Sequence, residues 1–97
     1  MAIDLQDRVT VAEEVLSNEV GGESVLLNLK NEHYYGLDEV GTRMWLVLTT
    51  SESFGAAMQT LLEEYEVEED RLRSDMEILV GKLAEQGLVT IHAAAPA

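Results

Sequence analysis

The sequence predicts an α+β fold, in which a three-stranded antiparallel sheet near the N-terminus is followed by three helices. Runs of β-branched and aromatic residues, separated by turn residues, fill the chain to about residue 37. Apolar residues then recur at the spacing of amphipathic helices as far as residue 86. Of the 97 residues, 46% are hydrophobic, which indicates a packed core. We expect a single domain with its core over about residues 8–92 and a flexible tail at 93–97.

The first part of the chain contains four short runs with strand character: residues 8–12, 15–20, 24–30 and 33–37. The pair Gly21–Gly22 predicts a tight turn before the third run, and the letters KNE predict another turn after it. Side chains alternate along a strand, so the third run has two faces. These are Val25, Leu27 and Leu29 on one face, and Leu26, Asn28 and Lys30 on the other.

The first two helices are predicted from their caps and their apolar spacing. Asp38 is a suitable N-cap for the first helix, because its carboxylate accepts hydrogen bonds from free N–H groups of the first turn. The second helix follows Ser51 or Ser53. The predicted buried faces are Val40, Met44, Val47 and Leu48 in the first helix, and Phe54, Ala57, Met58, Leu61, Leu62 and Tyr65 in the second.

The third helix, over about residues 68–86, is the longest. Acidic residues in its first turn complement the helix dipole, and Gly87 is typical of a residue that ends a helix. The letters LVTIH after this glycine predict a short final strand. The apolar stripe of the helix steps by four, three and four residues: Leu72, Met76, Leu79 and Leu83.

Strands, three helices and a short final strand are close to a winged helix-turn-helix plan, which raises the possibility of DNA binding. The charge counts against it. The chain has 19 acidic residues against six lysines and arginines, a net charge of −13. A recognition helix needs basic groups to neutralise phosphates, and acids outnumber arginines on the third helix. We therefore expect no nucleic acid partner, no membrane partner, and a preference for basic partners.

Residues for enzymatic chemistry are sparse. The absence of cysteine excludes disulfides, thiolate metal sites and cysteine nucleophiles. His33 and His92 lie far apart in the sequence without metal-binding spacing, and no G-x-S-x-G motif is present. We expect no catalytic residue, no metal and no cofactor. Neither a secretion signal nor a run of eighteen apolar residues is visible, so a cytoplasmic location is expected.

Residues 24–91 contain an ordered set of motifs. An apolar strand and a turn precede the block YYGLDEVGTRMW, which is followed by the linker YEV and the helix DMEILVGKLAEQGL. In this order and spacing they resemble the PqqD-like family, over about two-thirds of the chain. The resemblance implies a winged-helix-like domain that binds the leader of a ribosomally made, post-translationally modified peptide as an added strand. It also implies delivery to a modifying enzyme: a radical SAM protein in pyrroloquinoline quinone synthesis, or a leader peptidase in lasso peptide pathways.

The resemblance also implies where the peptide binds. The receiving strand is residues 33–37, and the groove lies against the third helix. The implied contacts are His33, Tyr34, Tyr35, Gly36 and Leu37 on the strand, and Leu72, Asp75, Met76, Leu79 and Leu83 on the helix. The sequence departs from the family at Glu32, where the hairpin usually has glycine. The acidic run LLEEYEVEEDRLRSD is similar to the stand-alone lasso peptide partners.

These residues also have a physical interpretation. An edge strand leaves N–H and C=O groups unpaired, and an incoming peptide strand satisfies them. Tyr34 and Tyr35 alternate faces, so one can pack in the core while the other flanks the peptide, although ordinary sheet packing is the alternative for either. Asp75 would hold a lysine or arginine of the peptide. The acidic segment Glu63–Asp70 is either a solvated connection between helices or a docking surface for a basic peptide.

The leading hypothesis is a non-catalytic protein that binds a precursor peptide. The alternative is an acidic winged-helix module that binds another protein and has no part in peptide modification. An enzyme ranks third, because no constellation of acid, base, nucleophile or metal ligands is visible.

Overall fold

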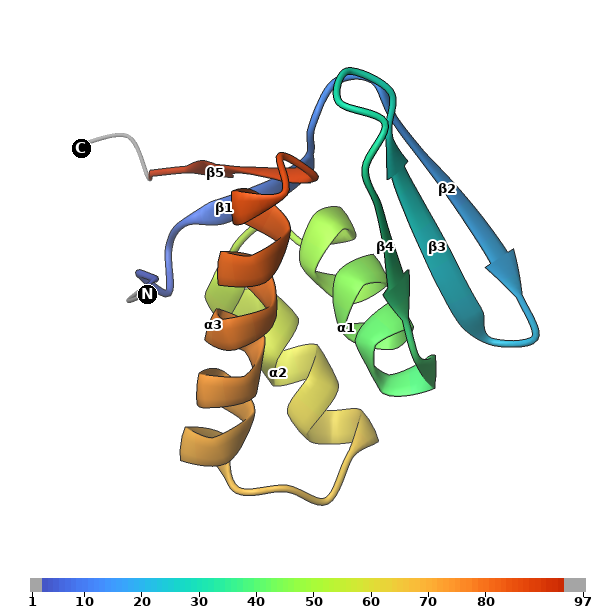
Figure 1. Ribbon diagram of the computed structural model, residues 1–97. Helices are drawn as coiled ribbons and strands as arrows, with labels where there is room; N and C mark the ends of the chain where they lie inside the picture. The colour runs from blue at the N-terminus through green and yellow to red at the C-terminus, as the bar shows by residue number, and fades with distance from the viewer. Residues whose placement is uncertain (1–2, 94–97) are drawn as a thin grey trace.

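The computed structural model describes residues 3–93 (Figure 1), and the predicted α+β fold is confirmed. The elements follow in the order β1 (Arg8–Val11), β2 (Val15–Val20), β3 (Glu23–Asn28), β4 (Tyr34–Leu37), α1 (Glu39–Thr50), α2 (Phe54–Glu64), α3 (Glu69–Glu85) and β5 (Val89–His92). The predicted tail at 93–97 lies outside the described residues from residue 94 onward.

The strands form two separate antiparallel sheets. The three-stranded sheet has the order β2-β3-β4, and β1 pairs with β5. The first predicted run therefore joins the C-terminal strand, with Arg8 opposite His92.

A two-residue turn connects β2 to β3, and its residues Gly21 and Gly22 have φ values of 62° and 86°. Positive φ at both positions is the geometry of a tight hairpin turn, and glycine adopts it without steric cost.

Side-chain caps begin the first two helices. The Asp38 Oδ1 atom accepts a hydrogen bond from the Gly41 N–H at 2.7 Å, as the sequence predicted. Ser53, rather than Ser51, caps α2, and its hydroxyl accepts from the Ala56 N–H at 3.1 Å. A Cβ atom at Gly41 would lie 3.2 Å from the same Asp38 oxygen. Glycine in the first turn of α1 therefore permits a close cap.

The core lies between the three helices and one face of the three-stranded sheet. Leu26 and Asn28 point inward from β3, whereas Val25 points outward. The strand therefore turns the less apolar of its two sets of side chains toward the core. On α1, the prediction that Val40 is buried is wrong. Its side chain is 47% exposed, while Thr42 and Trp45 are buried.

The core also includes residues before β1. Ile3 is buried, so the core begins earlier than the predicted residue 8. Its N–H donates to the Glu77 carboxylate at 2.8 Å, and its carbonyl accepts from the Arg73 guanidinium at 3.1 Å. Both partners belong to α3. The N-terminal segment is therefore held against the outer side of this helix.

Asn28 connects the three-stranded sheet to the end of α3. Its side chain is buried, and its Nδ2 donates to the carbonyls of Gln86 at 3.2 Å and Gly87 at 3.1 Å. Its Oδ1 accepts from the Lys30 N–H at 2.9 Å. The orientation of the sheet relative to α3 therefore depends on the Asn28 amide. The sequence alone gave no sign of this role for Asn28.

We expect Asn28→Ala to lower the free energy of unfolding by about 2–3 kcal/mol, because each buried polar group left without a partner costs roughly 1–3 kcal/mol. Urea denaturation followed by the fluorescence of Trp45, the single tryptophan and a buried one, measures the change. The control is Asn31→Ala, since Asn31 accepts from the His33 N–H in an exposed turn. Equal losses in the two variants would contradict a stabilising role for the contact with α3.

Candidate functional site

β4 is the edge strand of the three-stranded sheet that lies nearest the helices. One side of it pairs with β3, and within residues 3–93 no strand pairs with its other side. The Asn28 N–H donates to the His33 carbonyl at 2.9 Å, which makes these two residues a hydrogen-bonded pair of the antiparallel ladder. Bonded and non-bonded pairs alternate along such a ladder. Tyr35 and Leu37 therefore direct their backbone groups toward β3.

Tyr34 and Gly36 direct their backbone groups the other way, toward the free edge. Each residue offers one N–H and one C=O group there, so the edge presents a donor and an acceptor at two positions. A Cβ atom at Gly36 would meet nothing within 4 Å. An extended chain therefore finds two ready pairing positions on β4, and the face of the sheet to which a Gly36 Cβ atom would point is also open.

The free edge of β4 lies on the side of α1, and α3 lies on the other side of α1 (Figure 1). A pocket of about 340 Å³ opens between the start of α1 and the first half of α3. Apolar side chains of α1, α3 and the connection between α2 and α3 line it, together with four polar or charged ones. The lining residues are Val40, Met44, Tyr65, Glu66, Val67, Arg71, Leu72 and Asp75.

The residues predicted on the receiving strand lie on both faces of the sheet. Tyr34 is 77% exposed and points away from the helices, whereas Tyr35 is partly buried and packs against the core. Leu37 is buried at the end of β4, and His33 is exposed just before the strand. The two tyrosines thus take opposite faces. Glu32, where the family usually has glycine, has a φ of 60°, a conformation that favours glycine.

The residues predicted on α3 divide into two groups. Leu72 and Asp75 line the pocket, and Leu79 is half-buried on the same helix. Met76 and Leu83 are 0% exposed, because α3 turns this face into the hydrophobic core. This corrects the expectation that they line a groove, since their side chains are out of reach of any ligand in this structure.

Sequence reasoning missed several residues of the pocket. Val40 and Met44 were assigned to the buried face of α1, and Tyr65 to that of α2, although all three line the opening. The sequence signal that could have identified the pocket was the letters YEV, which break the helical pattern between α2 and α3. An apolar residue in such a break, here Val67, has no helix face to occupy and closes one end of the pocket.

Charge around the site is mostly negative. Arg43 makes a bidentate ion pair with Glu64, with distances of 2.8–3.2 Å, and joins α1 to α2. The hydrogen bonds to Glu64, and its charge, raise the pKa of Arg43.

Within residues 3–93, no three histidine or acidic side chains gather in a way that could hold a metal ion. In the same range, no helix is both long and apolar enough to cross a membrane.

Comparison with known proteins agrees with this geometry. Residues 23–89 match the family model of coenzyme PQQ synthesis protein D (PqqD). The chain belongs to the PqqD family. The resemblance predicted from the sequence is therefore confirmed, and the family match runs from the first residue of β3 to the first of β5. β1 and β2 lie before it.

Two solved structures resemble this PqqD-family chain over nearly its whole length. TbiB1 in complex with the TbiA(beta) leader peptide has a TM-score of 0.77 and 28% identity, over 90% of this chain and 99% of that one. Lasso peptide synthetase B1 complexed with the leader peptide has a TM-score of 0.73 and 26% identity, over 88% of this chain and 98% of that one. No curated protein sequence matches the chain at a significant level.

Proposed function

We propose that this protein binds the leader of a ribosomally made precursor peptide as a strand along β4. The observation that carries the proposal is the free edge of β4, with its outward backbone groups at Tyr34 and Gly36. The apolar pocket between α1 and α3 is a second supporting observation. Similarity to two proteins whose structures are in complex with leader peptides also supports the proposal. Strand addition suits a leader, because backbone hydrogen bonds hold an extended chain whatever its side chains are.

The pocket supplies selectivity in this proposal. An apolar leader side chain would fill the space above Met44 and Leu72, and a lysine or arginine would lie beside Asp75. Four backbone hydrogen bonds at about 1 kcal/mol each and two buried side chains at about 2 kcal/mol each give about 8 kcal/mol, which corresponds to about 1 μM. Because ordering of the peptide offsets part of this free energy, we expect affinity no tighter than micromolar.

The protein acts without catalysis in this proposal and requires no cofactor. It delivers the precursor to a modifying enzyme, such as a radical SAM protein or a leader peptidase. Pathways that make lasso peptides or pyrroloquinoline quinone both fit, and the similarity to lasso peptide synthetase B1 favours the lasso peptide class.

NMR titration of the labelled protein with candidate precursor peptides tests the proposal. We expect the amide signals of residues 34–37 and the side-chain signals of Met44, Leu72 and Leu79 to shift together, with saturation at one equivalent. Ile78, exposed on the outer side of α3, is the internal control and should not shift. A response confined to the acidic segment Glu63–Asp70 would contradict strand addition and favour the alternative of a protein-interaction module.

A further inference from the structure

The three-stranded sheet has a second face that the helices do not cover. Residues opposite one another in the register share a face, so Leu16, Leu27 and Tyr34 form one row across the three strands. Asn18, Val25 and Gly36 form the next row. Apart from half-buried Leu27, the large side chains of these rows are exposed, as is Val20 at the hairpin end, at 73%. We call this set of side chains the outer face.

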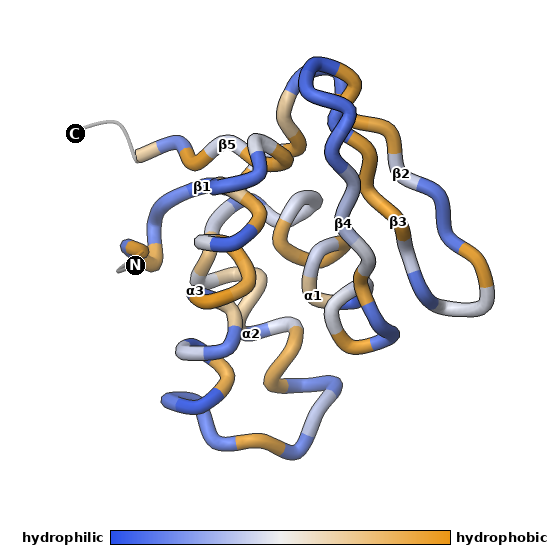
Figure 2. Tube along the Cα trace, in the orientation of Figure 1, coloured by the Kyte–Doolittle hydropathy of each residue, from blue (hydrophilic) through white to orange (hydrophobic). Residues whose placement is uncertain are grey.

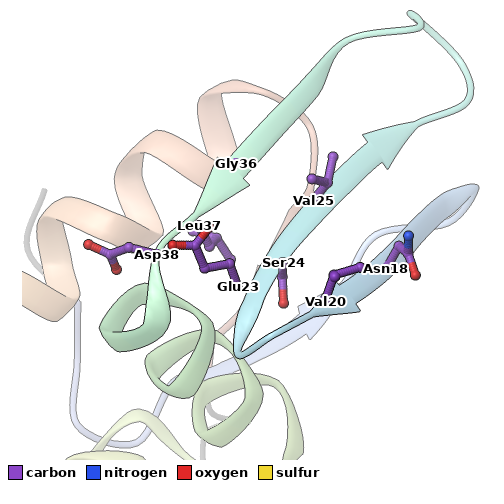
Figure 3. Close-up of a pocket in the computed structure, with 8 residues that line it drawn as sticks. All are labelled: Asn18, Val20, Glu23, Ser24, Val25, Gly36, Leu37 and Asp38. Carbon is purple, nitrogen blue, oxygen red and sulfur yellow. The ribbon is translucent and has the colours of Figure 1, made fainter.

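The outer face is hollowed in two places. One hollow of about 450 Å³ lies by the hairpin end, where Val25 lies opposite the open position at Gly36 and Val20 lines the hollow from β2 (Figure 3). The other, of about 460 Å³, lies between β2 and β3, lined by Leu16, Leu27 and their neighbours. Figure 2 shows hydrophobic segments along this hairpin, which stands away from α2 and α3. A contiguous apolar surface of this kind is typical of a protein-binding site.

The outer face has acidic residues at its hairpin end. The segment that carries this face, residues 13–39, contains seven acidic residues against one lysine. Glu23 and Asp38 line the hollow at the hairpin end directly. A second copy of this chain is a poor occupant, because each copy carries a net charge of −13 and the two copies would repel.

We infer that the outer face docks the enzyme that receives the precursor, through an apolar patch on that enzyme bordered by lysine and arginine. The inference rests on the proposed function, and it assigns a surface separate from the free edge of β4. Apolar contacts at the centre supply affinity, while the opposite charges at the hairpin end orient the partner and speed association. The peptide would pair with backbone groups at the edge of β4, whereas the enzyme would contact side chains of the outer face, so both bind at once.

The test compares two double variants of the whole protein. Leu16→Thr with Val25→Thr removes two apolar side chains of the outer face, and threonine has the β-branched shape that strands favour. The matched control, Val11→Thr with Ile78→Thr, removes two exposed apolar side chains elsewhere. Each variant is titrated with the precursor peptide, and separately with the purified modifying enzyme or leader peptidase encoded beside this protein.

We expect the outer-face variant to keep its affinity for the precursor and to lose about tenfold or more in affinity for the enzyme. The control should keep both. Affinity of wild-type protein for the enzyme should also fall between 0.1 M and 1 M salt, where the Debye length drops from ~10 Å to ~3 Å.

Three results would overturn the inference. The first is unchanged enzyme affinity in the outer-face variant, the second is enzyme affinity that does not fall with salt, and the third is a wild-type dimer in sedimentation that this variant dissociates. Failure of the wild-type protein to bind the precursor would contradict only the proposed function, because the enzyme is titrated without precursor.

Discussion

Met76→Glu is expected to abolish cooperative folding of the domain. Met76 is 0% exposed and lies among the buried residues of α3, which packs against α2. The substitution loses the packing of a buried methionine, which costs about 2–5 kcal/mol, and buries a carboxylate, which costs several more. A domain of this size has roughly 5–10 kcal/mol of stability, so the two losses together consume most or all of it.

Thermal and urea unfolding followed by far-UV circular dichroism and Trp45 fluorescence measure the effect. The matched control is Ile78→Glu, which introduces the same carboxylate two residues later on the exposed side of the same helix. We expect this control to unfold cooperatively with a midpoint close to that of the wild type. A Met76→Glu protein with the wild-type unfolding transition would contradict the assignment of this face of α3 to the core.

Gly36→Pro is expected to weaken binding of the precursor by about tenfold or more, which corresponds to about 1.4 kcal/mol or more. The Gly36 N–H points to the free edge of β4, so proline removes a donor that only the peptide would use. The peptide carbonyl that would have accepted from the Gly36 N–H is left without a partner, at a cost of roughly 1–3 kcal/mol. Pairing with β3 is retained, because Tyr35 and Leu37 carry those bonds.

Gly36→Ala is the matched control for this measurement. It keeps the N–H group, and its Cβ atom meets nothing within 4 Å, so we expect precursor affinity within about twofold of the wild type. Fluorescence anisotropy of a labelled precursor gives both affinities, and urea unfolding confirms that each variant is folded. If the proline variant binds as tightly as the alanine variant, the peptide does not pair with β4.

Much of the secondary structure and the family could be predicted because both depend on neighbours along the chain. Apolar spacing fixed the three helices to within a few residues, and Asp38 was identified as a cap from its place before the first helix. The two-glycine turn was equally local, since Gly21 and Gly22 adopt positive φ without the help of distant residues. The order of the motifs then indicated the PqqD family.

The candidate site was predicted less completely, because amphipathic patterns do not say what covers each face. The family resemblance implied a groove along α3, yet Met76 and Leu83 are buried while Asp75 is exposed. Val40 has the spacing of a core residue on α1 and instead lines the pocket. Each helix has one apolar side, and packing of the three helices decides which part of that side stays open.

The sequence alone determined the class of fold, the acidic surface and the family, since periodicity, composition and motif order depend only on the chain. Only the tertiary structure decided that β1 pairs with β5 and that β4 keeps a free edge. It also decided that Asn28 faces the core and Val25 the outside. Strand pairing and the choice of a buried face are interactions between distant segments, and their free energy depends on which surfaces meet once the helices have packed.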